Sequence, residues 1–440
     1  FWDGDPVDIQ RDTYHGFVLE LPYEVILEHA PTYVAELNRN APVAWLYAYW
    51  NGTNWGIPTY RIRNLYPAPG LWREDWLENV GIETVPTTLE EMEEALYRFR
   101  HNDPDGNGIK DTYGMCPNAQ VWFHAFAEVF GAYNVLPYDW VVRDGRVTWG
   151  GILPEAKAAL GVLRRWYERE IIHPDFVSGQ AGGTATDQKF ASGRIGYVYA
   201  RGRHRSLDMT LKTSTAYVVS QLSPHAAIAV GAFPEGPDGH RGARVWGPGG
   251  HVIAFGKHLQ HEPEKVIRVL RMFEAIARSE ALFLEARTGI RGRHWEYNDD
   301  RGLFHPPPFD QRGMDKRHLL NLQFNVAGGF YSACGAPPEI VDKYTQPARL
   351  EFRETFRKPK WGIANVLGKP GTVPSAGDYL EDLRKLQLTV YAELIRGDRP
   401  LAYFDDFVDE WLERGGKQMI EEANDLYEAR DGIYRRVGVE

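Results

Sequence analysis

Asp103-Pro104-Asp105-Gly106-Asn107-Gly108-Ile109-Lys110-Asp111 is the stretch that says most about this chain. Oxygen-bearing side chains stand at loop positions 1, 3, 5 and 9, and a glycine stands at position 6, an alternation that wraps a short loop around a hard cation. The expected ligands are the side chains of Asp103, Asp105, Asn107 and Asp111 and the backbone carbonyl of Ile109. An all-oxygen set suits Ca²⁺ better than a transition metal, which prefers nitrogen or sulfur. The loop therefore predicts a structural calcium site.

Two interpretations of this loop stay open. Position 12, where a bidentate Glu closes an EF-hand loop, is Gly114, and the residues up to Pro117 cannot begin a second helix cleanly. A solvated turn made of Asx and glycine residues, without metal, has the same composition. We expect a structural calcium clip and not a calcium sensor, with the metal-free turn as the alternative.

A strongly predicted helix leads into the loop. Pro86-Thr87-Thr88-Leu89-Glu90-Glu91 contains two overlapping capping boxes, Thr87 with Glu90 and Thr88 with Glu91. Apolar residues then follow at helical spacing: Leu89, Met92, Leu96 and Phe99. The helix should run directly into the calcium loop.

The rest of the chain alternates helical and extended patterns. Helical patterns cover 17–37 with an end near Ala30-Pro31, and also 72–80, 154–170, 263–277 and much of 375–430. Extended patterns cover 55–60, 195–199 and 252–255, and a hairpin is expected over 141–149 around Asp144-Gly145. This mixture predicts an α/β protein with two lobes crossed by several chain passages.

Length and composition narrow the class of protein. A chain of 440 residues suggests two lobes of roughly 150–250 residues each. A net charge of −10 without blocks of Lys or Arg argues against a nucleic-acid partner. The 14 Trp, 23 Tyr and 20 Phe suit stacking on sugars or other flat ligands, although core packing explains many of them.

The sequence contains few features that indicate the cellular location of the protein. Two cysteines, Cys116 and Cys334, neither prove nor exclude export. No segment approaches the roughly 20 apolar residues of a membrane span, and no signal peptide is visible. The sequence opens at Phe1-Trp2 without Met or a charged leader, so we expect that an N-terminal piece is absent.

The order of several motifs resembles one family. Leu71–Leu77, Pro86–Glu91 and Asp103–Gly114, supported by Trp55–Pro58, Glu170–Phe176, Phe190–Gly196 and Pro263–Lys265, resemble family 1 of the extracellular solute-binding proteins of ABC importers. The calcium-carrying branch with the alginate oligosaccharide-binding proteins looks most similar. The resemblance extends from about Asp8 to the C-terminus. Thr112 departs from it, because those relatives carry a carboxylate ligand at this position.

The resemblance implies a fold and a function. The fold is a two-lobe periplasmic-binding-protein-like α/β fold of class II type, with an interlobe ligand cleft and extra C-terminal helices. Lobe 1 would comprise 1–60 and 251–326, and lobe 2, with the calcium loop, 61–250 and 327–440. The implied protein is a non-enzymatic monomer, periplasmic or anchored at the cell surface as a lipoprotein. It would capture an oligosaccharide, including an acidic, uronate-containing one, and deliver it to the membrane subunits of an ABC importer.

By resemblance, the chain crosses between the lobes near 60–64, 246–250 and 325–331, where residues reach the ligand from both sides. The candidate ligand contacts are Tyr60, Arg61, Arg63, Trp122, Tyr199, Arg201, Trp246, Phe330 and Tyr331. Rings stack on sugar faces, and arginines bind hydroxyl or carboxylate groups. Core packing of the rings and solvated surface positions for the arginines are the alternatives.

Other chemistries find little support. No Asp or Glu pair is singled out for glycoside hydrolysis, and His258 with His261 lacks a third zinc ligand. Gly247-Pro248-Gly249-Gly250 lacks the Lys-Ser/Thr of a phosphate loop. The remaining alternative function is a carbohydrate-active enzyme or an accessory glycan-binding module.

Overall fold

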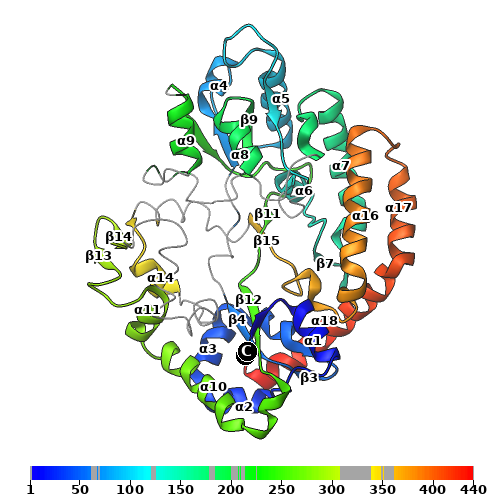
Figure 1. The fold of residues 1–440 in the computed structure, drawn as a ribbon. Coiled ribbons are helices and arrows are strands. Elements are labelled where there is room, and N and C mark those ends of the chain that lie inside the picture. Colours follow the sequence, from blue (N-terminus) through cyan, green and yellow to red (C-terminus); the bar gives the residue numbers. More distant parts are fainter. Residues whose placement is uncertain are drawn as a thin grey trace.

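Two groups of helices and strands lie at opposite ends of an elongated molecule, and extended segments join them (Figure 1). The computed structural model describes residues 2–60, 67, 70–119, 125–177, 184–199, 207, 209, 214–223, 225–307, 338–347, 350 and 361–439. We name the two groups by their sheets: lobe 1 contains β1-β12-β4 and lobe 2 contains β10-β5-β9-β6. The α/β two-lobe fold expected from the sequence is thereby confirmed.

Lobe 1 is built on an antiparallel sheet of β1 (Trp2–Gly4), β12 (Gly249–Ala254) and β4 (Ile57–Tyr60). Its helices are α1 (Pro6–Tyr14), α2 (Tyr23–His29), α3 (Pro31–Asn40) and α10 (Pro263–Ala277), with the 3₁₀ segments η1 (Pro42–Ala48) and η6 (Lys257–His261). The helical pattern predicted over 17–37 divides into α2 and α3 because Pro31 begins a new helix. Prediction and structure agree on α10, and β12 begins three residues before the strand expected from Val252.

Lobe 2 is built on a mixed sheet of β10 (Ile228–Gly231), β5 (Gly70–Arg73), β9 (Ile195–Tyr199) and β6 (Tyr113–Met115). β5 is antiparallel to both of its neighbours, whereas β6 is parallel to β9. The helices of lobe 2 are α4 (Glu74–Asn79), α5 (Leu89–His101), α6 (Ala127–Ala132), α7 (Pro154–Glu168), α8 (Thr184–Ala191) and α9 (Thr215–Leu222). Of the two predicted capping boxes, Thr88 with Glu91 caps α5.

Smaller elements surround these lobes. The predicted hairpin is formed by β7 (Trp140–Arg143) and β8 (Arg146–Trp149), with Asp144 and Gly145 both at positive φ, as in a tight hairpin turn. The other short elements are β2 (Tyr49–Trp50), β3 (Thr53–Asn54), η3 (Gly150–Ile152), η4 (Pro174–Val177), α11 (Glu280–Thr288), β13 (Glu296–Asn298), β14 (Gly302–Phe304) and α14 (Pro338–Lys343).

Between the lobes, β11 (Ala243–Arg244) pairs in parallel with β15 (Gly362–Ile363) (Figure 1). From β11 the chain continues into β12 in the sheet of lobe 1, so 245–248 is a crossing, as predicted. The chain also passes from β4 in lobe 1 to β5 in lobe 2, which agrees with the first predicted crossing. The third predicted crossing, 325–331, lies outside the described residues. The structure adds a crossing after β15 that leads to η8 (Pro370–Thr372) beside α1.

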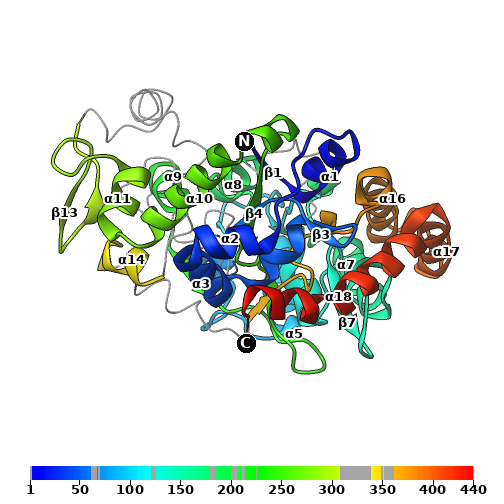
Figure 2. The same cartoon turned by 90° about the horizontal axis from the view of Figure 1, so that it is seen from below.

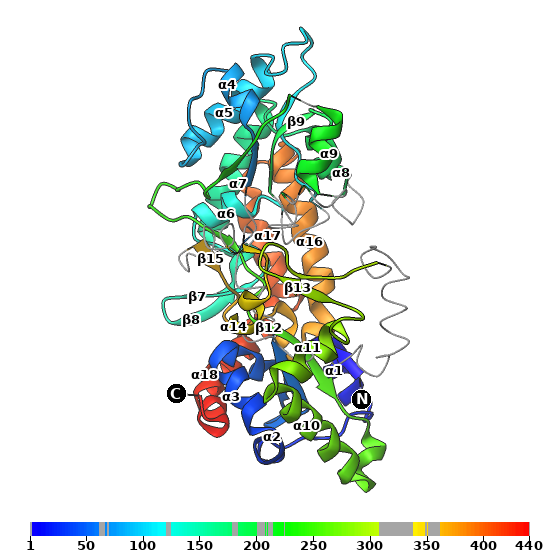
Figure 3. The ribbon, with the colours of Figure 1, turned by 90° about the vertical axis from the view of Figure 1, so that its left-hand side faces the viewer.

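Three helices end the described chain: α16 (Ala376–Arg396), α17 (Tyr403–Trp411) and α18 (Lys417–Val437), with a short π-helical turn, η9 (Leu412–Gly416), between the last two. α16 and α17 run along one side of the molecule, and α18 continues beneath lobe 1 (Figure 1). α16 packs on α1 of lobe 1 and on α7 of lobe 2, so it spans the junction (Figure 3). Seen from below, α18 lies beside α2 and α3 (Figure 2). The predicted extra C-terminal helices are present, while the predicted boundaries of the lobes stay a prediction. Among the described helices, none is both long enough and apolar enough to cross a membrane.

Candidate functional site

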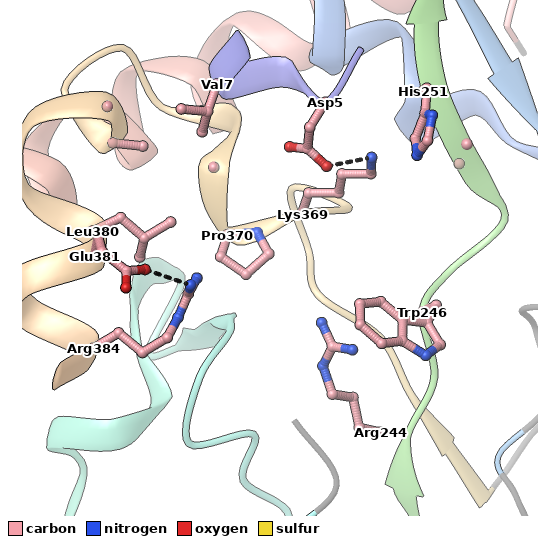
Figure 4. Close-up of a pocket in the computed structure, with 15 residues that line it drawn as sticks. Asp5, Val7, Arg244, Trp246, His251, Lys369, Pro370, Leu380, Glu381 and Arg384 are labelled. Atoms are coloured by element: carbon pink, nitrogen blue, oxygen red, sulfur yellow. Dashed lines mark hydrogen bonds and ion pairs between the residues drawn. The ribbon is translucent and has the colours of Figure 1, made fainter. Parts of the chain in front are cut away.

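A pocket of about 600 Å³ opens beside the crossing segments (Figure 4). Four segments form its walls: the start of α1, the chain from β11 to β12, the loop that ends in η8, and the first turns of α16. The lining residues are Asp5, Val7, Arg244, Trp246, Gly249, Gly250, His251, Lys369, Pro370, Gly371, Ala376, Gly377, Leu380, Glu381 and Arg384. The pocket therefore lies at the junction of the lobes, where ligand sites of two-lobe proteins commonly form.

The first ion pair of the pocket joins residues 364 positions apart. Asp5 occupies the N-cap position of α1, yet its side chain makes no capping hydrogen bond. Its Oδ2 instead accepts a hydrogen bond from the Lys369 Nζ at 3.0 Å. Pro6 follows at the first position of the helix, where a missing N–H costs nothing. The helix start thus presents a carboxylate to the pocket, and the crossing loop supplies its cation.

Trp246 provides the aromatic surface of the pocket. Trp246 is 37% exposed to solvent, which is a large exposed fraction for so large an apolar residue. The guanidinium carbon of Arg244 lies 4.1 Å from the centre of the Trp246 ring. Because Arg244 covers one face of the ring, the stacking surface that remains for a ligand is the other face and the edges (Figure 4).

Arg244 is itself held from behind. Its Nε donates to Oδ2 of Asp139, and its Nη2 donates to Oδ1 at 3.0 Å. The amide of Asn365 donates to the same Oδ1 at 2.9 Å. Such a two-point contact fixes the plane of a guanidinium. The platform beneath Trp246 is therefore rigid.

Backbone forms the wall next to Trp246. A Cβ atom at Gly249 would lie 2.2 Å from the Tyr47 hydroxyl, and one at Gly250 would lie 2.2 Å from Thr59 Oγ1. At Gly368, on the neighbouring crossing, a Cβ would come within 2.3 Å of the same Tyr47 hydroxyl. Tyr47 is fully buried between the two crossings, so both need glycine. This packing explains the glycine-rich stretch that does not match a phosphate loop.

A second ion pair lies on the opposite wall. Arg384 Nη1 lies 3.3 Å from Glu381 Oε2, one turn earlier on α16. Burial lowers the pKa of the Arg384 guanidinium, while the charges of Glu381 and Asp139 act in the opposite direction. The pocket rim thus carries three basic side chains, Arg244, Lys369 and Arg384, against two acidic ones, Asp5 and Glu381. It combines one ring with several hydrogen-bonding groups.

The residues predicted as ligand contacts reach different places. Trp246 lines the pocket. Tyr60 is only 2% exposed and packs near Tyr33, so it is already buried without a ligand. Tyr199 is buried in lobe 2 next to Phe233 and is not among the lining residues. The other candidates, Arg61, Arg63, Trp122, Arg201, Phe330 and Tyr331, lie outside the described residues.

Sequence reasoning missed several lining residues. Asp5 carried a local signal, since an Asp followed by Pro marks a helix start. Lys369 carried a weaker one, because it stands in the turn-like stretch Gly368-Lys369-Pro370-Gly371. Arg384 carried none, because a charged residue within an amphipathic helix is normally a surface residue.

The predicted calcium loop leaves the end of α5 at the far end of lobe 2 from lobe 1. Asp103 Oδ1 and Oδ2 accept from the backbone N–H groups of Asn107 and Gly108 at 3.1 and 2.9 Å. The Asn107 amide donates to Asp105 at 2.9 Å and to Asp111 at 3.4 Å. The carboxylates therefore gather around one amide group.

Burial and the neighbouring carboxylates affect the pKa of Asp105. Burial raises the pKa of its carboxyl group, and the hydrogen bond with Asp103 and the charges of Asp111 and Asp103 raise it further. Thr112, by contrast, is buried and donates its hydroxyl to the Phe99 carbonyl at 2.7 Å, so it points away from the loop. In the described part of the chain, no group of three or more His, Cys, Asp or Glu side chains is arranged to hold a metal ion.

Comparison with known proteins gives the fold a context. No protein-family model matches the chain. It is 24% identical over 379 residues to the polygalacturonan/rhamnogalacturonan-binding protein YtcQ of Bacillus subtilis, covering 86% of this chain and 70% of the relative. It is 25% identical over 389 residues to lipoprotein LipO of the same organism, covering 86% and 72%.

Two solved structures share the fold over nearly all of this chain. The alginate-binding protein AlgQ2 without calcium ion superposes with a TM-score of 0.67 at 15% identity, covering 96% of this chain and 84% of AlgQ2. An EF-hand mutant of the S. pneumoniae ABC-transporter substrate-binding protein FusA, in complex with fructo-nystose, gives 0.62 at 15%, covering 97% and 86%. The family resemblance stated from the sequence is confirmed.

Proposed function

We propose that this chain, which has the fold of the solute-binding proteins of ABC importers and resembles them in sequence, captures an acidic oligosaccharide outside the cytoplasmic membrane and hands it to an importer. The observation that carries the proposal is the pocket at the lobe junction, where Trp246 offers a stacking face within a rim of paired charges. A sugar presents both an apolar face and hydroxyl groups, and these need a ring and hydrogen-bonding side chains. YtcQ, a binding protein for acidic polysaccharides, and the lipoprotein LipO support the ligand class and the extracellular location.

The basic side chains of the rim favour an acidic ligand. Lys369 and Arg384 face the pocket, and an arginine can bind a carboxylate with two parallel hydrogen bonds. Their protein partners, Asp5 and Glu381, are 47% and 66% exposed, so water and ions already weaken these pairs. A uronate carboxylate can therefore compete for either cation at small cost.

Calorimetry with oligogalacturonides and with neutral oligosaccharides of the same length tests this assignment. We expect saturable binding with a preference for the acidic series. Arg384→Gln should weaken that preference by about tenfold, which corresponds to the roughly 1.4 kcal/mol of one hydrogen-bonded ion pair. Arg396→Gln is the matched control, because Arg396 is an arginine on the same helix that pairs with Asp398 and does not line the pocket. Equal effects of the two variants would refute the role of Arg384.

The similar proteins are binding proteins, and we propose that this chain likewise does not turn over its ligand. The alternative, a carbohydrate-active enzyme, needs two carboxylates placed across a glycosidic bond. In the pocket, the carboxylate of Asp5 is paired with Lys369 and that of Glu381 with Arg384. Release of reducing ends from a bound oligosaccharide in proportion to protein concentration would overturn the binding assignment.

We also propose that the loop from Asp103 to Asp111 binds Ca²⁺ as a structural ion. Gly106 and Gly108 have positive φ, so the loop has the sharp turns that gather oxygens. The residues fit a hard cation if the Asn107 amide turns its oxygen inward, because the oxygen then joins the carboxylates of Asp105 and Asp111 around one point. A bound cation would relieve the repulsion that Asp105 now experiences.

Thermal melts with Ca²⁺ and with chelator test the calcium site. Because the ion binds the folded state, the melting temperature should rise with calcium concentration. Asp105→Asn should abolish the rise. Asp144→Asn, in the Asp-Gly turn of the β7–β8 hairpin, is the matched control and should keep it. Melting temperatures of the unchanged protein that do not differ between calcium and chelator would refute the site.

A further inference from the structure

We propose that Asp139 is the positioning residue of the ligand pocket. It fixes Arg244 beneath Trp246 and connects two crossings, the one after β11 and the one after β15, to the β7–β8 hairpin. The inference rests on the proposed function, since Trp246 is taken as the surface on which the sugar stacks. Asp139 itself is not a lining residue, so its effect on a ligand must pass through the residues that it holds.

The contacts of Asp139 join three parts of the chain. The side chain is 1% exposed and precedes β7 directly. Arg244, at the end of β11, donates to both of its carboxylate oxygens. Asn365, just after β15, donates its amide to Oδ1 at 2.9 Å and accepts from the Leu367 N–H at 2.9 Å. One buried carboxylate therefore connects the hairpin with both of these crossings.

The neighbouring residue strengthens the same connection. The Trp140 indole donates to the Pro370 carbonyl at 3.0 Å, and the Trp140 carbonyl accepts from the Val366 N–H at 3.1 Å. Pro370 lines the pocket next to Lys369. Asp139 and Trp140 together thus determine where the crossing after β15 reaches the pocket.

Charge and geometry make Asp139 difficult to replace. A guanidinium held at two points by a carboxylate keeps a fixed plane, and here that plane lies against the Trp246 ring at 4.1 Å. Without the carboxylate, Arg244 would be a buried charge without its counter-charge and would tend to leave its place. Trp246 would then lose its contact with the guanidinium, and its ring would be held less firmly. A ligand would have to order the ring on binding, and this ordering costs affinity.

A double-mutant cycle separates positioning from general stability. Asp139→Asn keeps the shape of the side chain and removes its charge, and it should weaken oligogalacturonide binding about tenfold. In a Trp246→Ala background, the same substitution should change affinity by less than about twofold, since the positioned ring is gone. Glu93→Gln is the matched control. Glu93 is another largely buried carboxylate between two arginines, Arg165 and Arg169, but it lies away from the pocket, so only stability should respond.

The outcomes are distinct. Arg244→Lys, which keeps a cation opposite Asp139 but loses the flat two-point contact, replaces Asp139→Asn in the cycle if that variant does not fold. Additive losses in the two backgrounds would overturn the positioning role and leave the binding function intact. An unchanged protein that binds no oligosaccharide would instead refute the proposed function itself. Coupling that appears with Asp139→Asn or Arg244→Lys and not with Glu93→Gln would establish the role.

Discussion

Replacing Trp246 with alanine should weaken oligosaccharide binding about tenfold, and it should also lower the free energy of unfolding by about 2–4 kcal/mol, because the larger part of the side chain is buried in the free protein. The substitution removes the ring on which we place the sugar. It leaves Arg244 with its buried partner Asp139, so no uncompensated charge results. The stability cost comes from the buried part of the side chain, about 160 Å², which includes its contact with the Arg244 guanidinium.

The expected loss of binding free energy follows from the exposed area of the Trp246 side chain. A tryptophan side chain buries at most about 250 Å², and 37% exposure leaves about 90 Å² of Trp246 to be covered. At about 25 cal/mol per Å², complete coverage contributes about 2 kcal/mol. A sugar that stacks on one face covers only part of this area. About 1.4 kcal/mol, or tenfold in affinity, is therefore the expected loss.

Titration calorimetry with an oligogalacturonide gives the affinity, and urea unfolding gives the stability. Tyr14→Ala is the matched control, since Tyr14 is a highly exposed ring at the end of α1 that does not line the pocket. It should leave the affinity unchanged. If Trp246→Ala binds within twofold of the unchanged protein, the ring is not the stacking surface. A large loss of stability without a matching loss of affinity would show that Trp246 serves the core.

Three further perturbations test the fold of lobe 2 and the closure of the lobes. Burial raises the pKa of Glu128 to about 7 from an ordinary 4.5, although its own backbone N–H and the Tyr197 hydroxyl act in the opposite direction. The unfolded chain therefore loses this proton first, and stability falls as pH rises from 4.5 to 7 and stays reduced above 7. Glu128→Gln should raise the free energy of unfolding at pH 8, relative to its effect at pH 4, by on the order of 3 kcal/mol; a difference independent of pH would contradict this. Thr88→Ala removes the N-cap of α5 and should cost about 1 kcal/mol in urea unfolding without changing ligand affinity. Ligand binding should close the lobes about the crossings and reduce the radius of gyration in small-angle scattering, whereas an unchanged radius would indicate a rigid site.

Elements whose signals are local could be predicted from the sequence. The capping box of α5 needs only Thr88 and Glu91, and the hairpin turn needs only Asp144 and Gly145, because each interaction is complete within four residues. The helix over 263–277 was predicted for the same reason, from an apolar face repeated along 15 residues. The family resemblance depended on the order of such local motifs.

The pocket could be predicted only in part, because its chemistry is not local. Asp5 meets Lys369 across 364 residues, and Arg244 meets Asp139 across 105. Nothing in the composition of either segment indicates its partner. Trp246 was found because the resemblance placed a crossing there, whereas the crossing after β15 was missed because short extended segments between helices carry a weak signal. The acidic loop is the strongest motif of the sequence because nine consecutive residues contain all of its chemistry. It lies away from the pocket, so this strong local signal gave no information about the pocket.

The three basic side chains of the pocket are not equivalent, and their partners determine which of them a ligand can reach. Arg244 pairs with a carboxylate that is 1% exposed, and removing one member of such a buried pair is costly. Lys369 and Arg384 pair with carboxylates that water already reaches, and such pairs contribute at most about 1 kcal/mol. An acidic sugar should therefore displace Asp5 or Glu381 and leave Arg244 in place. Arg244 then acts as the support of the stacking ring, while Lys369 and Arg384 act as the groups that select the charge of the ligand. Binding of an acidic oligosaccharide should accordingly weaken as salt screens the attraction between its carboxylate and Lys369 or Arg384, whereas the contribution of Trp246 should not change with salt.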